Sequence, residues 1–187
     1  MHALTLLGPR CAATIALVLS ASPASAAPAR LALEPKAGYA HALTTGLSPY
    51  GAFVGLGARA RVLGPLWLGT SVTAYSGGRA RADGPDVSYR ARDRAYDLRL
   101  DATWRFALSR WYVEPGAEAG AAWVMGSTYV TPVRITDRHV TGSFGPLLRS
   151  AWRTASIEVG IEGAALYVPS SVAAPILRGG VFVVLPL

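Results

Sequence analysis

Apolar and polar side chains alternate with a period of two along most of this 187-residue chain. The clearest example runs from position 96 to position 106, where six apolar residues are separated by Asp97, Arg99, Asp101, Thr103 and Arg105. Successive side chains of a β-strand point to opposite faces, whereas a helix would spread such charges around its circumference. The pattern therefore predicts strands with one apolar and one ionic face.

Segments with this alternation recur along the chain. We count eight, covering 30–42, 50–63, 66–77, 94–107, 111–126, 140–153, 156–168 and 175–187. The connections at 43–49, 78–93, 127–139 and 169–174 are long, and they take turns with short ones at 64–65, 108–110 and 154–155. Up-and-down membrane barrels have short turns at one end and longer loops at the other. We therefore expect an all-β, eight-stranded antiparallel up-and-down transmembrane barrel.

Acids and bases balance on the ionic side of these strands. Seven are acids and seven are bases: Glu34, Asp97, Asp101, Glu114, Glu118, Glu158 and Glu162 against Lys36, Arg59, Arg61, Arg99, Arg105, Arg149 and Arg153. Inside one small lumen an unpaired charge costs far more than a paired and hydrogen-bonded one, so equal numbers are expected there. We predict that these side chains form a salt-bridge network that fills a polar lumen.

The net charge of +7 must then lie outside the lumen. Removing seven of each sign from 18 bases and 11 acids leaves 11 bases and 4 acids. Most of these bases lie in the long connections, and the others lie at chain ends and turns, namely Arg10, Arg30, Arg110 and Arg178. The excess charge therefore belongs to the connections and gives no reason to expect nucleic acid as a partner.

Aromatic residues distinguish a membrane barrel from a soluble one, because both share the period of two. A lipocalin-like soluble barrel would turn its apolar side chains inward, with aromatics in the middle of strands. Here they cluster at strand ends on the apolar side, as in the interfacial girdles of membrane barrels: Trp67, Tyr75, Tyr96, Trp104, Phe106, Trp111, Trp123, Trp152 and Tyr167. We therefore expect the apolar side to face lipid.

The first 26 residues have the features of a secretory signal peptide. One positive side chain precedes an apolar run over 11–21, and Ala24-Ser25-Ala26 matches the small-x-small pattern at a cleavage site. The run is shorter than the roughly 20 residues of a membrane-spanning helix. We expect cleavage after Ala26 and a single barrel domain over 27–187.

These features resemble the small eight-stranded outer-membrane barrels of Gram-negative bacteria, such as the transmembrane domains of OmpA and OmpX. That family ends in an alternating strand with a terminal aromatic residue, which the barrel-assembly machinery reads. Val181, Val183 and Leu185 alternate here, but Leu187 replaces the aromatic residue and follows Pro186. The resemblance implies a monomer in outer-membrane lipid and lipopolysaccharide, with a structural or surface-interaction role.

Two other functions compete with this role. A narrow conduit for ions or small solutes would use a path such as Arg59, Asp97, Asp101 and Glu118. Eight strands, however, enclose a space just wide enough for side chains to fill, which favours a plug.

A lipid A hydrolase similar to the barrel PagL is the second alternative. His139 precedes Thr141 and Ser143 on its own side of a strand, but no acid follows on the adjoining outer face to orient its ring. Ligand-spaced clusters for a metal are also missing from the sequence. We therefore expect neither catalysis nor a metal or cofactor.

The connection over 78–94 is the most distinctive stretch outside the strands. Guanidinium groups form charge-assisted, bidentate hydrogen bonds with phosphates. We predict that arginines of this connection bind phosphates of lipopolysaccharide or another anionic surface ligand, with Arg79, Arg81, Arg90 and Arg92 as the candidates.

Overall fold

The computed structural model describes residues 31–43, 48–84, 88–154, 156–169 and 175–187. The signal peptide expected over 1–26 lies outside these residues. Among the residues described, no helix is long and apolar enough to cross a membrane.

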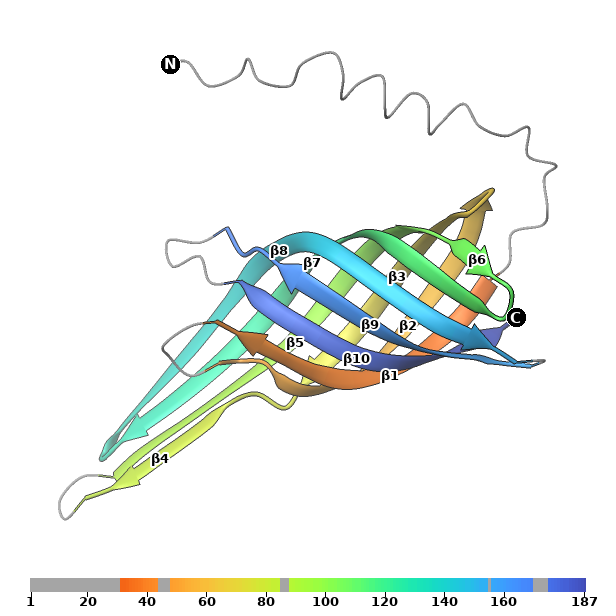
Figure 1. Ribbon diagram of the computed structural model, residues 1–187. Coiled ribbons are helices and arrows are strands. Elements are labelled where there is room, and N and C mark those ends of the chain that lie inside the picture. Colours follow the sequence, from red (N-terminus) through yellow and green to blue (C-terminus); the bar gives the residue numbers. More distant parts are fainter. Residues whose placement is uncertain (1–30, 44–47, 85–87, 155, 170–174) are drawn as a thin grey trace, which may run out of the picture.

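Antiparallel strands close into a ring (Figure 1). Their bounds are β1 (Leu31–Ala42), β2 (Gly51–Leu63), β3 (Leu66–Tyr75), β4 (Arg79–Asp83), β5 (Ser88–Trp104), β6 (Phe106–Leu108), β7 (Trp111–Val130), β8 (Val133–Arg153), β9 (Glu158–Leu166) and β10 (Ile176–Pro186). β1 pairs with both β2 and β10, and β5 pairs with both β3 and β7. With β4 continuing β3 and β6 continuing β5, the ring has eight strands, which confirms the expected fold class.

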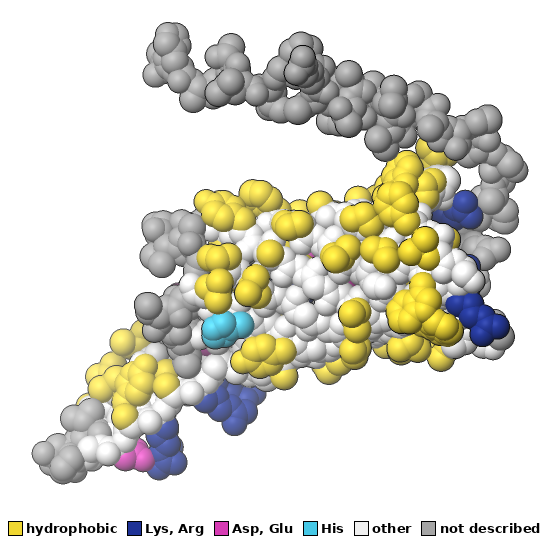
Figure 2. Space-filling model, in the orientation of Figure 1, with side chains coloured by type: hydrophobic (Ala, Val, Ile, Leu, Met, Phe, Trp, Pro, Cys, Tyr) yellow, Lys and Arg dark blue, Asp and Glu magenta, His cyan; other side chains and the backbone are white. Residues whose placement is uncertain are grey.

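The alternation predicted from the sequence is visible in the burial of single residues. Along β5, Asp97 and Arg99 are buried at 3% and 1% exposure, whereas Leu98 and Leu100 are exposed at 55% and 64%. Figure 2 shows hydrophobic side chains around the middle of the barrel and Lys and Arg side chains toward its two ends. The barrel is therefore polar inside and apolar outside, as a protein surrounded by lipid requires.

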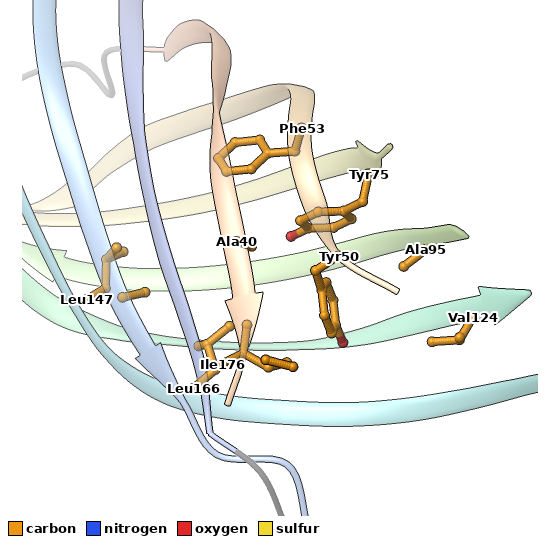
Figure 3. Close-up of a cluster of buried hydrophobic side chains, with 11 residues drawn as sticks. Ala40, Tyr50, Phe53, Tyr75, Ala95, Val124, Leu147, Leu166 and Ile176 are labelled. Carbon is orange, nitrogen blue, oxygen red and sulfur yellow. The ribbon is translucent and has the colours of Figure 1, made fainter. Parts of the chain in front are cut away.

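The interior has three layers along the barrel axis. At the loop end, a buried apolar cluster includes Tyr50, Phe53 and Tyr75, with Leu166 and Ile176 opposite (Figure 3). A second buried apolar cluster lies at the turn end and consists of Ala32, Tyr112, Ala151, Phe182 and Val184. Along β1, β7, β8 and β10 the buried charged residues lie in sequence between members of the two clusters. Apolar side chains are thus packed on the ionic middle of the lumen toward both ends.

Two of the long connections expected from the sequence are strands. Residues 79–83 and 88–93 form a hairpin of β4 and β5, and residues 127–139 belong to β7 and β8, joined at Thr131-Pro132. These strands extend past the rest of the barrel as a four-stranded sheet in the order β4-β5-β7-β8, here called the projecting sheet (Figure 1). Its charged composition suggested a loop, but Arg and Ala alternate along β4 and β-branched residues are frequent over 128–136.

A glycine makes the junction between β3 and β4 possible. Gly77 has a φ of +69°, and a Cβ atom there would lie 1.6 Å from the carbonyl oxygen of Asp93. Only glycine tolerates both the positive φ and this approach of two backbones. The break lets β4 continue along β5 after β3 has ended.

The aromatic girdle differs from expectation at two residues. Trp67 and Tyr75 point into the lumen and are buried at 7% and 5% exposure. They lie at inward positions of β3, where Trp67 packs under the guanidinium of Arg105 and Tyr75 donates a hydrogen bond to Asp97. The others are exposed or half-buried on the outer surface, and Tyr96 and Trp123 lie inside β5 and β7, where these strands leave the barrel wall: Tyr96, Trp104, Phe106, Trp111, Trp123, Trp152 and Tyr167.

Candidate functional site

One connected set of ion pairs fills the middle of the lumen. At its centre is Glu114 on β7, whose side chain is 0% exposed. Its Oε2 accepts hydrogen bonds from Arg59 Nη1 at 2.7 Å and Arg149 Nη1 at 3.3 Å, and its Oε1 accepts one from Arg105 Nε. Three guanidiniums, from β2, from β8 and from the residue between β5 and β6, therefore share one carboxylate.

Glu162 on β9 links this centre to the loop-end half of the lumen. Its carboxylate lies 3.5 Å from Arg149, 3.3 Å from Arg178 and 3.6 Å from Lys36. Arg178 in turn reaches Glu118, and Arg99 lies between Glu118 and Asp97. Glu34, Asp101 and Glu158 are each bound to one of these residues, and Arg153 is bound in turn to Glu158.

The residues of this network differ from the predicted set at one position, because Arg178 is present and Arg61 is absent. The sequence pattern places Arg178 at a chain end or turn, but the residue lies inside β10 and is 4% exposed. Arg61, predicted as a member, lies instead at the turn end, where its Nε donates a hydrogen bond to the carbonyl of Gly64. With Arg178 in place of Arg61, the connected set again contains seven acids and seven bases. Arg153 is at the rim, with 45% of its side chain exposed.

Aromatic rings cover guanidiniums at the turn end of the network. Arg105 lies 3.7 Å from the centroid of the Tyr112 ring, and Arg149 lies 3.9 Å from that of Phe182. Cation–π contacts of this kind gain strength where water is excluded. Tyr112 and Phe182 of the apolar cluster at this end therefore contact the guanidiniums of the network directly.

A second charged site lies on the projecting sheet. The register of β5 with β7 and of β7 with β8 runs without a bulge from the barrel wall to the tips of the strands. The alternate residues whose side chains face lipid in the barrel therefore continue onto one side of the projecting sheet, here called the outer face. Every arginine of the projecting sheet is on this face, and all are exposed: Arg79, Arg81, Arg90, Arg92, Arg94, Arg134 and Arg138.

Cross-strand pairing arranges this face in rows. Tyr96, Trp123 and Val140 form an aromatic and apolar row at the barrel rim. Three basic rows follow outward, each shifted by two residues: first Arg94, Met125 and Arg138, next Arg79, Arg92, Ser127 and Thr136, and last Arg81, Arg90, Tyr129 and Arg134. The four arginines predicted from the sequence occupy the outer two rows. Arg94, Arg134 and Arg138 were not among those candidates. Arg94 shares the parity of Arg90 and Arg92 on β5, whereas Arg134 and Arg138 join this face only through the register of β7 with β5 and β8.

Like charges are crowded on the outer face. Arg79 pairs directly opposite Arg92, and Arg81 opposite Arg90. Partial desolvation, together with the neighbouring charges of Arg94 and Arg79, lowers the pKa of the Arg92 guanidinium from its ordinary value. The acid on this face among the residues described is Asp83, whose Oδ2 accepts a hydrogen bond from Arg81 at 2.7 Å. Like charges directly opposite each other destabilise a sheet, so an anion bound between them would stabilise it.

A depression of about 530 Å³ lies in the outer two rows. Residues of β5, β7, β8 and the turn between the last two line it: Ser88, Arg90, Ala91, Arg92, Ser127, Thr128, Tyr129, Thr131 and Arg134. Three guanidiniums, one phenol ring and several hydroxyl groups therefore meet around one concavity.

The opposite side of the projecting sheet carries the candidate histidine. His139 Nδ1 lies 3.0 Å from Asp137 Oδ2, so the acid that the sequence prediction found missing is supplied two residues earlier in the chain. Ser143 lies four residues away from His139, about 13 Å along the strand, and its hydroxyl accepts a hydrogen bond from Arg99 Nη1 inside the lumen. The structure therefore does not bring His139 and Ser143 together. No group of His, Cys, Asp and Glu that could hold a metal occurs within the described part of the chain.

Comparisons with known proteins show which solved structures share this fold. No family model and no curated protein matches the sequence. Among solved structures, a major outer membrane protein from Thermus thermophilus matches with a TM-score of 0.64 and 12% identity, over 86% of this chain and 100% of the other.

Two further structures have the same fold. Neisserial surface protein A gives a TM-score of 0.51 and 12% identity, over 84% of this chain and 96% of the other. The attachment invasion locus protein Ail of Yersinia pestis, in complex with the heparin analogue sucrose octasulfate, gives a TM-score of 0.52 and 8% identity, over 85% of this chain and 97% of the other. This chain thus has the fold of the small outer-membrane barrels, as its sequence resemblance implied.

Proposed function

We propose that this protein is an outer-membrane barrel with a non-catalytic surface-interaction role, in which the projecting sheet binds phosphate groups of the surrounding lipopolysaccharide. The observation that carries the proposal is the placement of all seven arginines of the projecting sheet on the continuation of the lipid-facing surface. Scattered loop arginines would face in several directions and would not form one anion-binding surface.

The height of the first basic row supports lipid phosphates as its ligands. Residues two apart on a strand are separated by about 7 Å, which a strand tilt near 40° reduces to roughly 5 Å along the membrane normal. The polar layer on each side of the hydrocarbon is about 5–8 Å thick. Arg94 and Arg138, one row beyond the aromatic row of Tyr96 and Trp123, therefore lie at the level of phosphate groups.

The packed lumen supports a role carried by the surface. The connected ion pairs and the apolar cluster at each end leave the charges on the conduit path, Arg59, Asp97, Asp101 and Glu118, bound to partners. The separation of His139 from Ser143 likewise supports a non-catalytic role. The proposal includes delivery by the signal peptide, insertion by the barrel-assembly machinery and a monomeric state.

Binding to vesicles tests the proposal. The full chain would be reconstituted in vesicles of zwitterionic phospholipid with and without lipopolysaccharide, and lipopolysaccharide retained per barrel would be measured after detergent extraction. Replacing Arg79, Arg81, Arg90, Arg92, Arg94 and Arg138 by Gln should reduce the retained amount at least tenfold. Arg110, an exposed arginine in a turn at the opposite end, serves as the control, and Arg110→Gln should retain the wild-type amount. Equal retention by all variants would refute the proposal.

A further inference from the structure

The outermost basic row lies above the level of the phosphates at the membrane surface, so any lipopolysaccharide phosphate that it binds belongs to the saccharide part of that molecule. Arg90 is six residues from Tyr96 along β5 without a bulge, a distance of about 20 Å along the strand. A tilt near 40° places it roughly 15 Å above the aromatic row, whereas the polar layer of a membrane is only about 5–8 Å deep. The depression between Arg90 and Arg134 therefore opens into the layer where saccharide, and not lipid, surrounds the protein.

An aromatic ring lies between charges in this row. Tyr129 pairs opposite Arg90 on one side and Arg134 on the other, so it lies between two arginines on the outer face. The ring is 38% exposed at the mouth of the depression. A simple phosphate site needs only the arginines. An exposed ring between them offers an apolar platform with a polar hydroxyl, which suits a ligand that has both a flat apolar face and anionic substituents.

Hydroxyl groups complete the lining. Ser88, Ser127 and Thr131 contribute short side chains that donate and accept hydrogen bonds. The ring hydroxyls of a sugar need partners of both kinds, whereas phosphate or sulfate groups need donors alone. The three chemistries of the depression, guanidinium, aromatic ring and hydroxyl, are thus those that recognise a charged sugar.

We propose that this depression is a binding subsite for an anionic saccharide, a sugar ring bearing phosphate or sulfate groups. Arg90, Arg92 and Arg134 would bind the anionic groups, and Tyr129 would stack on the ring. The subsite deepens the proposed function because it occupies the same outer face, but its ligand is the saccharide and its binding does not need lipid. Such a saccharide can come from the glycolipid leaflet or from a soluble glycan, and the chemistry of recognition is the same.

Calorimetric titration of the full chain in detergent micelles with sucrose octasulfate, a soluble polysulfated disaccharide, tests the subsite. Tyr129→Ala should weaken binding at least fivefold, and Tyr129→Phe, which keeps the ring, should stay within twofold of wild type. Arg90→Gln with Arg134→Gln should weaken binding at least tenfold. Tyr167→Ala, at an exposed tyrosine elsewhere on the barrel, should have no effect.

Matched variants separate this inference from the proposed function. Arg94→Gln with Arg138→Gln removes the same charge one row beyond the aromatic row and should leave sucrose octasulfate binding within threefold of wild type. Unchanged affinity for Tyr129→Ala, or equal losses for the two arginine pairs, would overturn the subsite and indicate attraction by net charge alone. If Arg94→Gln with Arg138→Gln loses lipopolysaccharide retention but keeps its affinity for sucrose octasulfate, the result supports the subsite as a separate binding site. Anomalous migration on gels before boiling verifies that each variant is folded.

Discussion

Arg178 Nη2 donates a hydrogen bond to Glu118 Oε2 at 2.6 Å, which joins β10 to β7 across the lumen. Both side chains are at most 2% exposed. The bond connects strands that are not neighbours in the ring, so it braces the barrel wall from the inside. Pairs of this kind replace the hydrophobic core that a soluble domain of this size would have.

Removal of one central carboxylate should destabilise the barrel strongly. Glu114→Ala leaves Arg59, Arg105 and Arg149 without their shared partner in a water-poor interior, at a cost of about 3–5 kcal/mol. Urea unfolding in micelles measures this change. Arg153→Ala, at the exposed rim, should cost less than about 1 kcal/mol. A similar loss for both variants would contradict a packed network.

Removal of both partners of a buried pair should cost less than the two single changes predict. Glu118→Leu with Arg178→Met replaces an ion pair by apolar side chains, which is often neutral, whereas each single change strands a charge. A double-mutant cycle on the free energy of unfolding should therefore give a coupling energy of at least about 2 kcal/mol. Strict additivity would show that the two residues are solvated independently. Glu162, which contacts Arg178 at 3.3 Å, and Arg99, which lies 3.7 Å from Glu118, are further members whose responses the cycle includes.

The intact barrel should not conduct ions. Two apolar clusters are packed on the ion pairs toward both ends of the lumen, and partner exchange among buried charges would be needed to open a path. Planar-bilayer recordings of the purified chain should show no discrete current steps, with a known porin as the positive control. Reproducible steps that change size in Asp101→Asn would instead support the conduit alternative.

A pair of acids outside the membrane should make the projecting sheet pH-sensitive. Asp93 and Asp137 flank Gly126 on neighbouring strands. Partial burial and the charge of Asp137 raise the pKa of Asp93, and His139 opposes this shift. The raised pKa favours the protonated acid in the folded sheet, so the sheet loses stability as the pH rises through that pKa. Below the pKa of the unfolded chain, both states are protonated and the penalty vanishes.

Asp93→Asn should remove this dependence. Backbone hydrogen exchange over 88–95 and 125–138 should be slower in Asp93→Asn than in wild type at pH 7 and equal in both at pH 3. Asp83→Asn, at the exposed tip of the same sheet, should leave exchange over these residues unchanged. Faster exchange in Asp93→Asn at pH 7 would show that the charged acid is stabilising.

The lumen network shows how far sequence patterns reach. Parity alone placed Glu34 and Arg149 on the inner side of their strands, because alternation is local. Their contact at 2.7 Å joins residues 115 positions apart and depends on how β1, β10, β9 and β8 are staggered around the ring. Arg178 was misplaced for a different reason: it lies near the expected start of a strand and was assigned to a turn, although it alternates with the lipid-facing Val181, Val183 and Leu185 and therefore has the inward parity.

The projecting sheet shows a different limit. Arg79 and Arg81 alternate with alanines, so the local pattern was that of a strand, but the charge of the segment favoured a solvated connection. Only the pairing of β4 with β5, β5 with β7 and β7 with β8 shows that seven arginines from three of these strands share one face, since separate strands do not specify their register.

Except at Trp67 and Tyr75, the sequence by itself determined which of the strand side chains discussed here face lipid and which face the lumen, because that choice depends on the period of two and on the cost of placing charges in hydrocarbon. The tertiary structure decided which charges meet and where the arginines gather. Those contacts depend on stagger and register, which arise only when strands far apart in the chain lie side by side.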